Sequence, residues 1–278
     1  MQLSIVIPTI NRKKELEKLL DSINHFVLNI VFEVIIIDQN SVGFLDDIID
    51  KFKNELNISH HLVDFKGLSK AKNYGAKVAK GEYISFPDDD CDIFPDTYSK
   101  ALAILKSLEV DIVFGRCIDS NGNDSVLNFK KTSYLLNKKN MLGGFVEATG
   151  LIHKGVFENN FYFDEKMGAG CFHGAEEGYD WLYRILTKTK LKVYYCKDVI
   201  YYHPQVVLDK SSSQAIKRVF TYSCGKAYLY KKHKFYYKYF KRLTLVALSI
   251  PFYLIFNKKK VRYYISELLG LMAGLILN

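Results

Sequence analysis

Short apolar segments alternate with amphipathic segments from Leu3 to Ile118. The apolar segments are rich in Val and Ile, and the segments between them carry apolar residues at helical spacing. The expected strands are residues 3–8, 32–37, 61–65, 82–86 and 111–118; the expected helices are residues 16–23, with Asn11 as N-cap, and residues 45–52, 68–80 and 98–108. This alternation is typical of a doubly wound, mostly parallel α/β sheet.

Polar residues follow three of the expected strands at the point where each strand ends. Pro8 and Thr9 close the first strand, Asp38 closes the second, and Asp88–Asp90 follow the fourth. Ligands of parallel sheets bind outside the carboxyl ends of the strands. We therefore expect these residues to lie on one edge of the sheet and to form a binding site there.

The run Asp88–Asp90 places three carboxylates side by side, shortly before Pro95. Folding alone does not require adjacent like charges, but a bound cation neutralises them. Mg²⁺ and Mn²⁺ prefer carboxylate oxygens and often share them with the phosphates of a substrate. The alternative is an acidic turn in water, since Asp is common in turns. The expected convergence with Thr9 and Asp38 favours a site.

After the last of these strands the pattern loosens. Residues 120–147 are polar and irregular, which fits an acceptor-side loop or a disordered insertion. Further strands are expected at residues 148–153, 192–196 and 199–202, and a helix is expected from about Glu176. Glu177, Asp180 and Arg184 share one face of that helix. Acidic residues in the first turn of a helix are favoured by the helix dipole. The functional alternative is that one of these acids is a general base.

The cysteines give information about the compartment. The five residues Cys91, Cys117, Cys171, Cys196 and Cys224 show no CxxC and no paired spacing. An odd, scattered set indicates a reducing compartment and argues against a disulfide framework or a zinc site. No basic segment, apolar run and cleavage site precede the first strand, so we do not expect export.

The charge is unevenly placed along the chain. Residues 1–209 carry 25 Lys and Arg against 29 Asp and Glu, whereas residues 210–278 carry 14 Lys and Arg against Glu267 alone. The net charges are −4 and +13, in agreement with +9 for the whole chain. A basic tail indicates an anionic partner, either nucleic acid or a membrane surface.

The composition of residues 211–278 favours the membrane. Basic residues are interleaved with Tyr and Phe, and two apolar runs of 13 residues follow at 244–256 and 265–277. Each run is shorter than the about 20 residues of a transmembrane helix. Such runs indicate a segment in the membrane interface, or a re-entrant hairpin packed through Gly270 and Gly274. Core helices packed on the sheet are the alternative, and nucleic-acid binding leaves the apolar runs unexplained.

Several segments occur in an order and spacing that is hard to obtain by chance. They are Ser4–Arg12, Ile36–Asp38, Gly67–Gly75, Gly81–Asp90, Glu176–Asp180 with Arg184, and His203. Over roughly residues 2–205 the chain therefore resembles the family 2 glycosyltransferases, whose nucleotide-sugar-binding fold is called GT-A. The resemblance implies a GT-A fold and an enzyme that transfers sugars.

The resemblance also implies roles for single residues in donor binding. Asp38 would hydrogen-bond the nucleotide base, and Asp88 would lie near the ribose. The residues implied in binding the nucleotide sugar are Pro8, Thr9, Arg12, Asp38, Lys70, Asn73, Asp88 and Asp89. These residues do not identify the donor, although Asp38 suits a uracil or thymine imide.

A divalent metal, Mn²⁺ or Mg²⁺, is implied as the cofactor. Asp88 and Asp90 resemble the two acids of the family's Asp-x-Asp motif, with Asp90 as the direct ligand. His203 follows the expected strand at 199–202 and resembles a late His that approaches the metal or the diphosphate in some members. The implied metal ligands are therefore Asp90, Asp88 and His203.

The general base of the family lies at the start of the helix near Glu176. Many members carry Glu-Asp there, but counting back from Arg184 gives Glu177-Gly178 in this chain. Glu177 is the preferred base, and Asp180 and Glu176 are the other candidates. The base would take a proton from an acceptor hydroxyl, which attacks the anomeric carbon opposite the departing nucleotide diphosphate. The anomeric configuration would therefore invert.

We expect residues 1–210 to form the GT-A catalytic domain and residues 211–278 to form a helical tail at the membrane interface. The implied function is metal-dependent, inverting transfer of a sugar to a hydroxyl of a lipid-linked glycan in cell-surface polysaccharide synthesis. It would take place at the cytoplasmic face of the inner membrane, with the protein peripheral or re-entrant and without a nucleic-acid partner.

Two alternative functions fit the sequence less well. A sugar-1-phosphate nucleotidyltransferase needs a Gly-rich, basic loop after the first strand, and residues 8–12 lack one. A catalytically silent sugar- or membrane-binding protein would not need Asp88, Asp90 and Glu177 together.

Overall fold

The computed structural model describes residues 2–26, 30–205 and 207–276. By compactness the chain divides into two units. The first comprises Met1–Lys66, Ala71–Tyr162 and Trp181–Gln205, and the second comprises Gly67–Lys70, Phe163–Asp180 and Val206–Asn278. Each unit is thus built from segments that lie far apart in the sequence. The division of roles between residues 1–210 and 211–278 stays a prediction.

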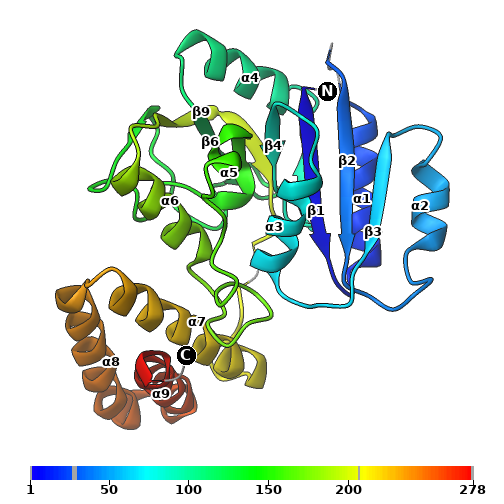
Figure 1. Ribbon diagram of the computed structural model, residues 1–278. Coiled ribbons are helices and arrows are strands. Elements are labelled where there is room, and N and C mark those ends of the chain that lie inside the picture. The colour runs from blue at the N-terminus through cyan, green and yellow to red at the C-terminus, as the bar shows by residue number, and fades with distance from the viewer. Residues whose placement is uncertain (1, 27–29, 206, 277–278) are drawn as a thin grey trace. The chain divides into compact units, whose positions relative to one another are not determined.

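Within the described residues the first unit holds a nine-stranded sheet (Figure 1). Its strands are β1 (Leu3–Thr9), β2 (Phe32–Asp38), β3 (Ile58–Leu62), β4 (Tyr83–Ser85), β5 (Asp92–Ile93), β6 (Ile112–Ile118), β7 (Tyr134–Leu136), β8 (Gly150–His153) and β9 (Val193–Tyr202). They lie in the order β3-β2-β1-β4-β8-β6-β9-β5, and β7 pairs with β9. β1, β2, β3 and β4 run parallel, whereas β8 is antiparallel to β4 and β6. The predicted doubly wound, mostly parallel α/β sheet is confirmed as a mixed sheet, in which β5, β7 and β8 run antiparallel to the strands they pair with.

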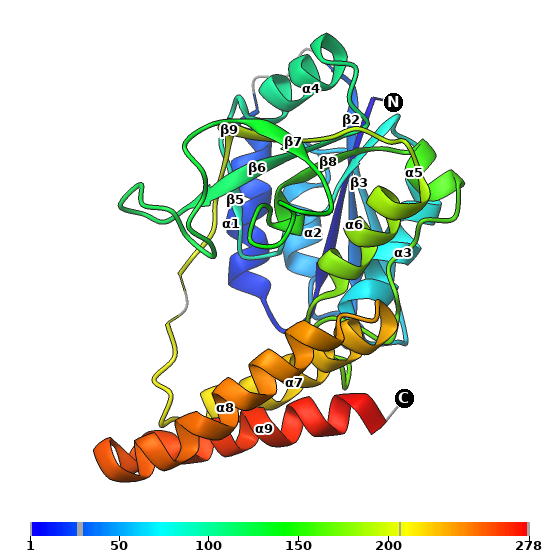
Figure 2. The ribbon, with the colours of Figure 1, turned by 90° about the vertical axis from the view of Figure 1, so that its left-hand side faces the viewer.

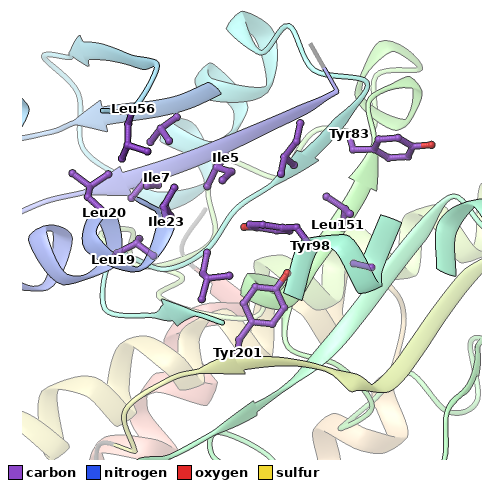
Figure 3. Close-up of a cluster of buried hydrophobic side chains, with 14 of the residues drawn as sticks. Ile5, Ile7, Leu19, Leu20, Ile23, Leu56, Tyr83, Tyr98, Leu151 and Tyr201 are labelled. Atoms are coloured by element: carbon purple, nitrogen blue, oxygen red, sulfur yellow. The ribbon is translucent and has the colours of Figure 1, made fainter. Parts of the chain in front are cut away.

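Helices on one face of the sheet form the main core with the strands. They are α1 (Lys13–Asn24), α2 (Asp46–Phe52) and α4 (Thr97–Ser107). Ile5 and Ile7 of β1 belong to this core, as Figure 3 shows, together with Leu19 and Tyr98 from the helices. The apolar spacing that predicted α1 is the spacing of its buried side chains.

The other face of β1 is covered by α3 (Leu68–Val78). A Cβ at Gly75 would lie only 2.1 Å from Cγ1 of Val6, so glycine allows the helix to approach the strand closely. The remaining helices before the tail are the 3-10 turn η1 (Glu147–Thr149), α5 (Gly155–Glu158) and α6 (Glu177–Lys188). Cover on both faces explains why the strands appear as apolar runs in the sequence.

The prediction that Asn11 caps the first helix is wrong. The N-cap is Arg12, whose side chain makes no capping hydrogen bond among the described residues. Asn11 has a φ of +58° and donates its backbone N–H to Oδ1 of Asn40 at 2.6 Å. Asn is favoured both at N-caps and in left-handed turns, and here it serves the turn after β1.

Two strands differ by more than two residues from their predicted bounds. β3 begins at Ile58 and not at residue 61, because it pairs with β2 from Val34 to Asp38. Two histidines inside β3 obscured its apolar pattern. The strands predicted at 192–196 and 199–202 are the single strand β9, whose pairing with β6 shifts register around Gly115. β7 lies inside residues 120–147, which were predicted to be irregular.

The second unit contains the helices of the tail. They are α7 (Ser213–Lys232), α8 (Tyr236–Phe256), η2 (Lys258–Lys260) and α9 (Val261–Ile276). α9 lies alongside α7 (Figure 2). Cβ atoms at Gly270 and Gly274 would lie 2.4 Å from the carbonyl oxygen of Phe220 and 2.3 Å from that of Cys224. The two glycines therefore pack α9 against α7, and not one apolar run against the other as the sequence suggested.

The helix α8 is longer than the apolar run at 244–256 from which it was predicted. It has 21 residues, because the aromatic and basic residues from Tyr236 onward continue the helix. In the described part of the chain it is the one helix long and apolar enough to cross a membrane, and such a single helix is weak evidence of a span. Leu277, at the end of the second apolar run, lies outside the described residues.

A buried hydrogen-bond cluster ties the first strands of the sheet to the start of β4. Oε1 of Glu33 accepts from Oγ of Ser4 at 2.6 Å and from the backbone N–H of Lys80 at 2.7 Å. Oγ of Ser4 accepts from the N–H of Gly81 at 2.8 Å. Glu33 is 4% exposed. Its carboxylate therefore satisfies donors that water reaches poorly.

Replacing Glu33 with Ala should lower the free energy of unfolding by about 2–4 kcal/mol, because two buried donors lose their acceptor. Urea unfolding followed by circular dichroism measures this change. Glu17→Ala is the matched control, since it removes an exposed carboxylate that pairs with Lys51 at 2.8 Å. The control should unfold nearly as the wild type does. Equal losses in both variants would refute a special role for the buried cluster.

Candidate active site

The carboxyl ends of the neighbouring strands β1, β2 and β4 lie on one edge of the sheet. Thr9 and Asp38 are paired in register at the ends of β1 and β2. β4 is parallel to β1 on its other side and leads into Asp88–Asp90. Pro8 and Thr9, at the end of β1, are buried, and so is Asn73 of α3. The structure thus brings together the polar strand ends that the sequence singled out.

Asp38 is almost fully buried and is held from both sides. Its Oδ2 lies 2.9 Å from Nε2 of His60, and its Oδ1 accepts from the backbone N–H and the side-chain amide of Asn40 at 2.9 and 2.7 Å. Each carboxylate oxygen can accept two hydrogen bonds. Oδ2 therefore retains the capacity to accept a further donor. The sequence gave no reason to link His60 to this residue.

Arg12 binds two of the three carboxylates in the acidic turn. Its Nη1 lies 3.0 Å from Oδ1 of Asp89 and also contacts Oδ2 of Asp90. Burial raises the pKa of Asp89 to about 6, although the charge of Arg12 opposes that shift. Asp89 is 7% exposed. Arg12 therefore helps to hold the acidic turn in place.

Asp88, Asp90 and His203 come together from the ends of two different strands. Nε2 of His203 lies 3.5 Å from Oδ2 of Asp88 and 3.7 Å from Oδ1 of Asp90. Nδ1 of His203 contacts the carbonyl oxygen of Pro204 at 2.9 Å, an arrangement that orients the imidazole with Nε2 toward the acids. Asp88, Asp90, Cys91 and His203 each offer an atom that lies within 4.8 Å of the others.

This group of side chains fits a divalent cation. Oδ1 of Asp90 is buried and has no hydrogen-bond partner among the described residues, so it can accept a water molecule or a ligand. Two carboxylates and an imidazole are a suitable donor set for Mn²⁺ or Mg²⁺. The sequence did not indicate Cys91. Burial raises the pKa of the Cys91 thiol well above its usual value, and hard cations prefer oxygen to sulfur.

His203 and Asp88 change each other's pKa. Burial alone would raise the pKa of Asp88, but the hydrogen bond from His203 and the charges of Lys72, His203 and Arg12 lower it overall. Burial alone would lower the pKa of His203, but Asp88 and Asp90 raise it overall. The cluster therefore attracts positive charge, which a divalent cation would supply more strongly than a proton.

A buried ion pair lies beside this cluster and was not predicted. Nζ of Lys72, on α3, lies 2.7 Å from Oε1 of Glu147, on η1, and both side chains are at most 10% exposed. The charge of Lys72 also acts on Asp88. The available signal was the helical spacing of Lys72 with Ala76 and Ala79, which places this lysine on the buried face of α3.

The other predicted site residues belong to the second unit: they are Lys70 and the three acids Glu176, Glu177 and Asp180. Asp180 is fully buried, and its Oδ1 lies 2.8 Å from both Nζ of Lys232 and Nε2 of His233. Glu176 precedes α6 with a φ of +75° and lies 3.5 Å from Nζ of Lys226. Glu177, the first residue of α6, is partly exposed.

A parallel sheet with an acid pair at its carboxyl edge is the architecture of the GT-A glycosyltransferases. The model of the family described as Glycosyl transferase family 2 matches residues 4–165. The chain therefore belongs to this family.

Two curated relatives illustrate the similarity. The poly(ribitol-phosphate) beta-N-acetylglucosaminyltransferase TarS of Staphylococcus aureus is 27% identical over 173 residues, which cover 60% of this chain and 30% of TarS. The GalNAc(5)-diNAcBac-PP-undecaprenol beta-1,3-glucosyltransferase of Campylobacter jejuni is 28% identical over 180 residues, which cover 60% of this chain and 56% of that protein. The chain thus spans less than a third of TarS and just over half of the Campylobacter enzyme.

Solved structures show the same fold. Residues 1–349 of Staphylococcus aureus TarS in complex with UDP-GlcNAc match with a TM-score of 0.64 and 22% identity, over 82% of this chain and 66% of that chain. The mannosyltransferase PcManGT from Pyrobaculum calidifontis, in complex with GDP-Man and Mn²⁺, matches with a TM-score of 0.65 and 14% identity. The second match covers 99% of this chain and 87% of the other.

Replacing Lys72 with Met should lower the free energy of unfolding by about 3–5 kcal/mol, because Glu147 would be left buried without its partner. The double variant Lys72→Met/Glu147→Leu should recover most of this loss. Lys77→Met is the control, since Lys77 is an exposed lysine on the same helix. Urea unfolding of the four proteins measures the differences. A double variant no more stable than Lys72→Met would contradict the ion-pair explanation.

Proposed function

We propose that the protein is an inverting, metal-dependent glycosyltransferase that transfers a sugar from a nucleotide-sugar donor to a hydroxyl of a lipid-linked glycan in cell-surface polysaccharide synthesis. The observation that carries the proposal is the cluster of Asp88, Asp90 and His203 at the carboxyl edge of the sheet in a family 2 chain. Oδ1 of Asp90, which is buried and has no hydrogen-bond partner among the described residues, supports the proposal of a bound divalent cation.

The donor is a nucleoside diphosphate sugar that binds along the ends of β1, β2 and β4. Asp38 receives the base, since its buried carboxylate retains room for another hydrogen bond. The donor-binding set is Pro8, Thr9, Arg12, Asp38, Lys70, Asn73, Asp88 and Asp89. The UDP-GlcNAc and GDP-Man complexes of the structural relatives support this class of donor without identifying the one used here.

Asp90, Asp88 and His203 would hold Mn²⁺ or Mg²⁺. When bound, such an ion offsets the negative charge that develops on the departing diphosphate. Nδ1 of His203 is engaged with the carbonyl oxygen of Pro204, which leaves Nε2 for the ligand role. Arg12 holds Asp89 and Asp90 in place around the same turn.

Glu177 acts as the general base. Its carboxylate takes the proton of the acceptor hydroxyl, whose oxygen forms a bond to the anomeric carbon while the bond from that carbon to the diphosphate oxygen breaks. Attack on the face opposite the leaving group inverts the anomeric configuration. Among the three candidate acids, Glu177 is favoured by its position counted back from Arg184, and it is partly exposed whereas Asp180 is fully buried.

The tail, residues 211–278, attaches the protein to the cytoplasmic face of the membrane as a peripheral or re-entrant element. α8 exposes a set of large apolar side chains beside the basic η2 turn, Lys258–Lys260. The exposed residues of α8 are Tyr236, Tyr237, Phe240, Leu245, Leu248, Phe252, Leu254, Ile255 and Phe256. Apolar side chains with nearby lysines suit an anionic membrane surface. The undecaprenol-linked acceptor in the name of the Campylobacter relative supports a lipid-linked acceptor.

The activity is tested with the full chain in detergent, a panel of nucleotide sugars, Mn²⁺ or Mg²⁺, and a lipid-linked acceptor extract. Released nucleoside diphosphate should depend on one donor, stop on chelation and return with added metal. Asp90→Ala should abolish turnover, and Glu177→Gln should lower kcat by about a hundredfold or more while donor binding persists. Asp96→Ala, at an exposed aspartate, is the control. Turnover that resists chelation would refute the metal site, and no turnover with any donor and acceptor would refute the transferase.

Membrane attachment is tested by flotation with anionic and neutral vesicles. The wild type should float with anionic vesicles, and Leu248→Asp/Ile255→Asp should bind at least about tenfold more weakly, because each change removes apolar area from the lipid contact. Leu135→Asp, at an exposed leucine of the first unit, is the control. Alkaline carbonate should release an interfacial tail but not a spanning helix. Equal flotation of all three proteins would exclude α8 from the contact.

A further inference from the structure

The C-terminal end of α7 contacts the acids at the start of α6, and both belong to the second unit. Nζ of Lys232, the last residue of α7, lies 2.6 Å from Oδ2 of Asp164 and 2.8 Å from Oδ1 of Asp180. His233, the C-cap of α7, places Nε2 2.8 Å from the same oxygen of Asp180. The Asp180 side chain is fully buried, and the contacts with Lys232 and His233 help to offset the free-energy cost of burying its carboxylate.

A second contact of α7 involves Glu176. Nζ of Lys226 lies 3.5 Å from a carboxylate oxygen of Glu176, less than two turns before the end of α7. Glu176 has a φ of +75°, a left-handed conformation that is uncommon for residues other than glycine. Such conformations persist where surrounding contacts maintain them, and they cluster at functional sites. α7 therefore contacts the acids on both sides of Glu177.

The segment from Asp164 to Gly168 packs on Glu177 and is bound by Lys232. A Cβ at Gly168 would lie 3.2 Å from Cδ of Glu177, so this backbone lies directly against the proposed base. The segment begins with Asp164, which accepts from Lys232 at 2.6 Å and contacts the hydroxyl of Tyr228 at 3.3 Å. Lys232 thus joins the helix that carries Glu177 to the segment that limits the space around its side chain.

We propose that Lys232 and His233 are positioning residues for the general base. Through Asp180 they fix the first turn of α6, and through Asp164 Lys232 also fixes the segment around Gly168, so that Glu177 points at the acceptor hydroxyl. The proposal rests on the proposed function of Glu177. It gives the tail a part in catalysis that is separate from attachment to the membrane. A misplacement of about 1 Å is enough to reduce a rate about a hundredfold.

The test compares the full chain with Lys232→Ala, His233→Ala, the conservative variants Lys232→Arg and His233→Asn, and Lys217→Ala. Lys217 is an exposed lysine on α7, so its removal changes the tail charge as Lys232→Ala does. The readouts are kcat and KM for transfer, donor binding, vesicle binding, and hydrogen exchange of a peptide covering residues 163–181.

Lys232→Ala and His233→Ala should lower kcat for transfer by about ten- to a hundredfold, with donor binding and vesicle binding close to those of Lys217→Ala. Amide exchange in residues 163–181 should become faster in both variants. Lys232→Arg and His233→Asn should restore part of kcat, because each retains a donor for Asp180. This recovery would not be expected from a general loss of stability.

Three results would overturn the proposal. The first is a kcat in both alanine variants equal to that of Lys217→Ala. The second is a parallel loss of donor binding, which would indicate a general structural defect. The third is amide exchange of residues 163–181 in both alanine variants that is no faster than in Lys217→Ala. Inactivity of the wild type with every donor and acceptor would instead count against the proposed function itself.

Discussion

Repulsion among the adjacent carboxylates Asp88–Asp90 is the constraint on which the site depends. Each compensating group comes from a different part of the chain. Arg12 comes from the turn after β1, Lys72 from α3, and His203 from the end of β9. These groups can meet the acids only if β1 lies beside β4 and β9 lies beside β6 in the same sheet. The order of the strands and the electrostatics of the acidic turn therefore depend on each other.

Much of this arrangement could be predicted because it follows from local patterns. Apolar runs and helical spacing gave β1, β2 and α4 within one residue and α1 within three. Parallel strands place their carboxyl ends on one edge, so the proximity of Thr9, Asp38 and Asp88–Asp90 followed without any tertiary information. His203 lies more than a hundred residues later in the chain, and it was linked to the acids by its position at the end of a strand and by the family resemblance.

The contacts that escaped prediction join residues whose partners are set by tertiary packing. Lys72 and Glu147 are 75 positions apart, and the sequence around either residue does not indicate the other as its partner. Asp180 and His233 are 53 positions apart, and the tail around His233 was interpreted only through its overall charge and its aromatic and apolar composition. The structure shows that some of that charge is used inside the second unit, as with Lys226, Lys232 and Arg242, which pairs with the buried Glu267. Counting charges cannot separate such internal partners from cations that face an anionic surface.

The composition of the second unit bears on how tails can be exchanged between relatives. It combines Val206–Asn278 with two short segments, Gly67–Lys70 and Phe163–Asp180, that are encoded much earlier. The backbone N–H of Leu68 donates to the carbonyl oxygen of Ala169 at 2.9 Å, so the two short segments are also bonded to each other. A graft that replaces the tail alone would separate residues that pack as one body. A chimera, natural or engineered, must therefore take all three segments from the same parent. The tail cannot be exchanged alone.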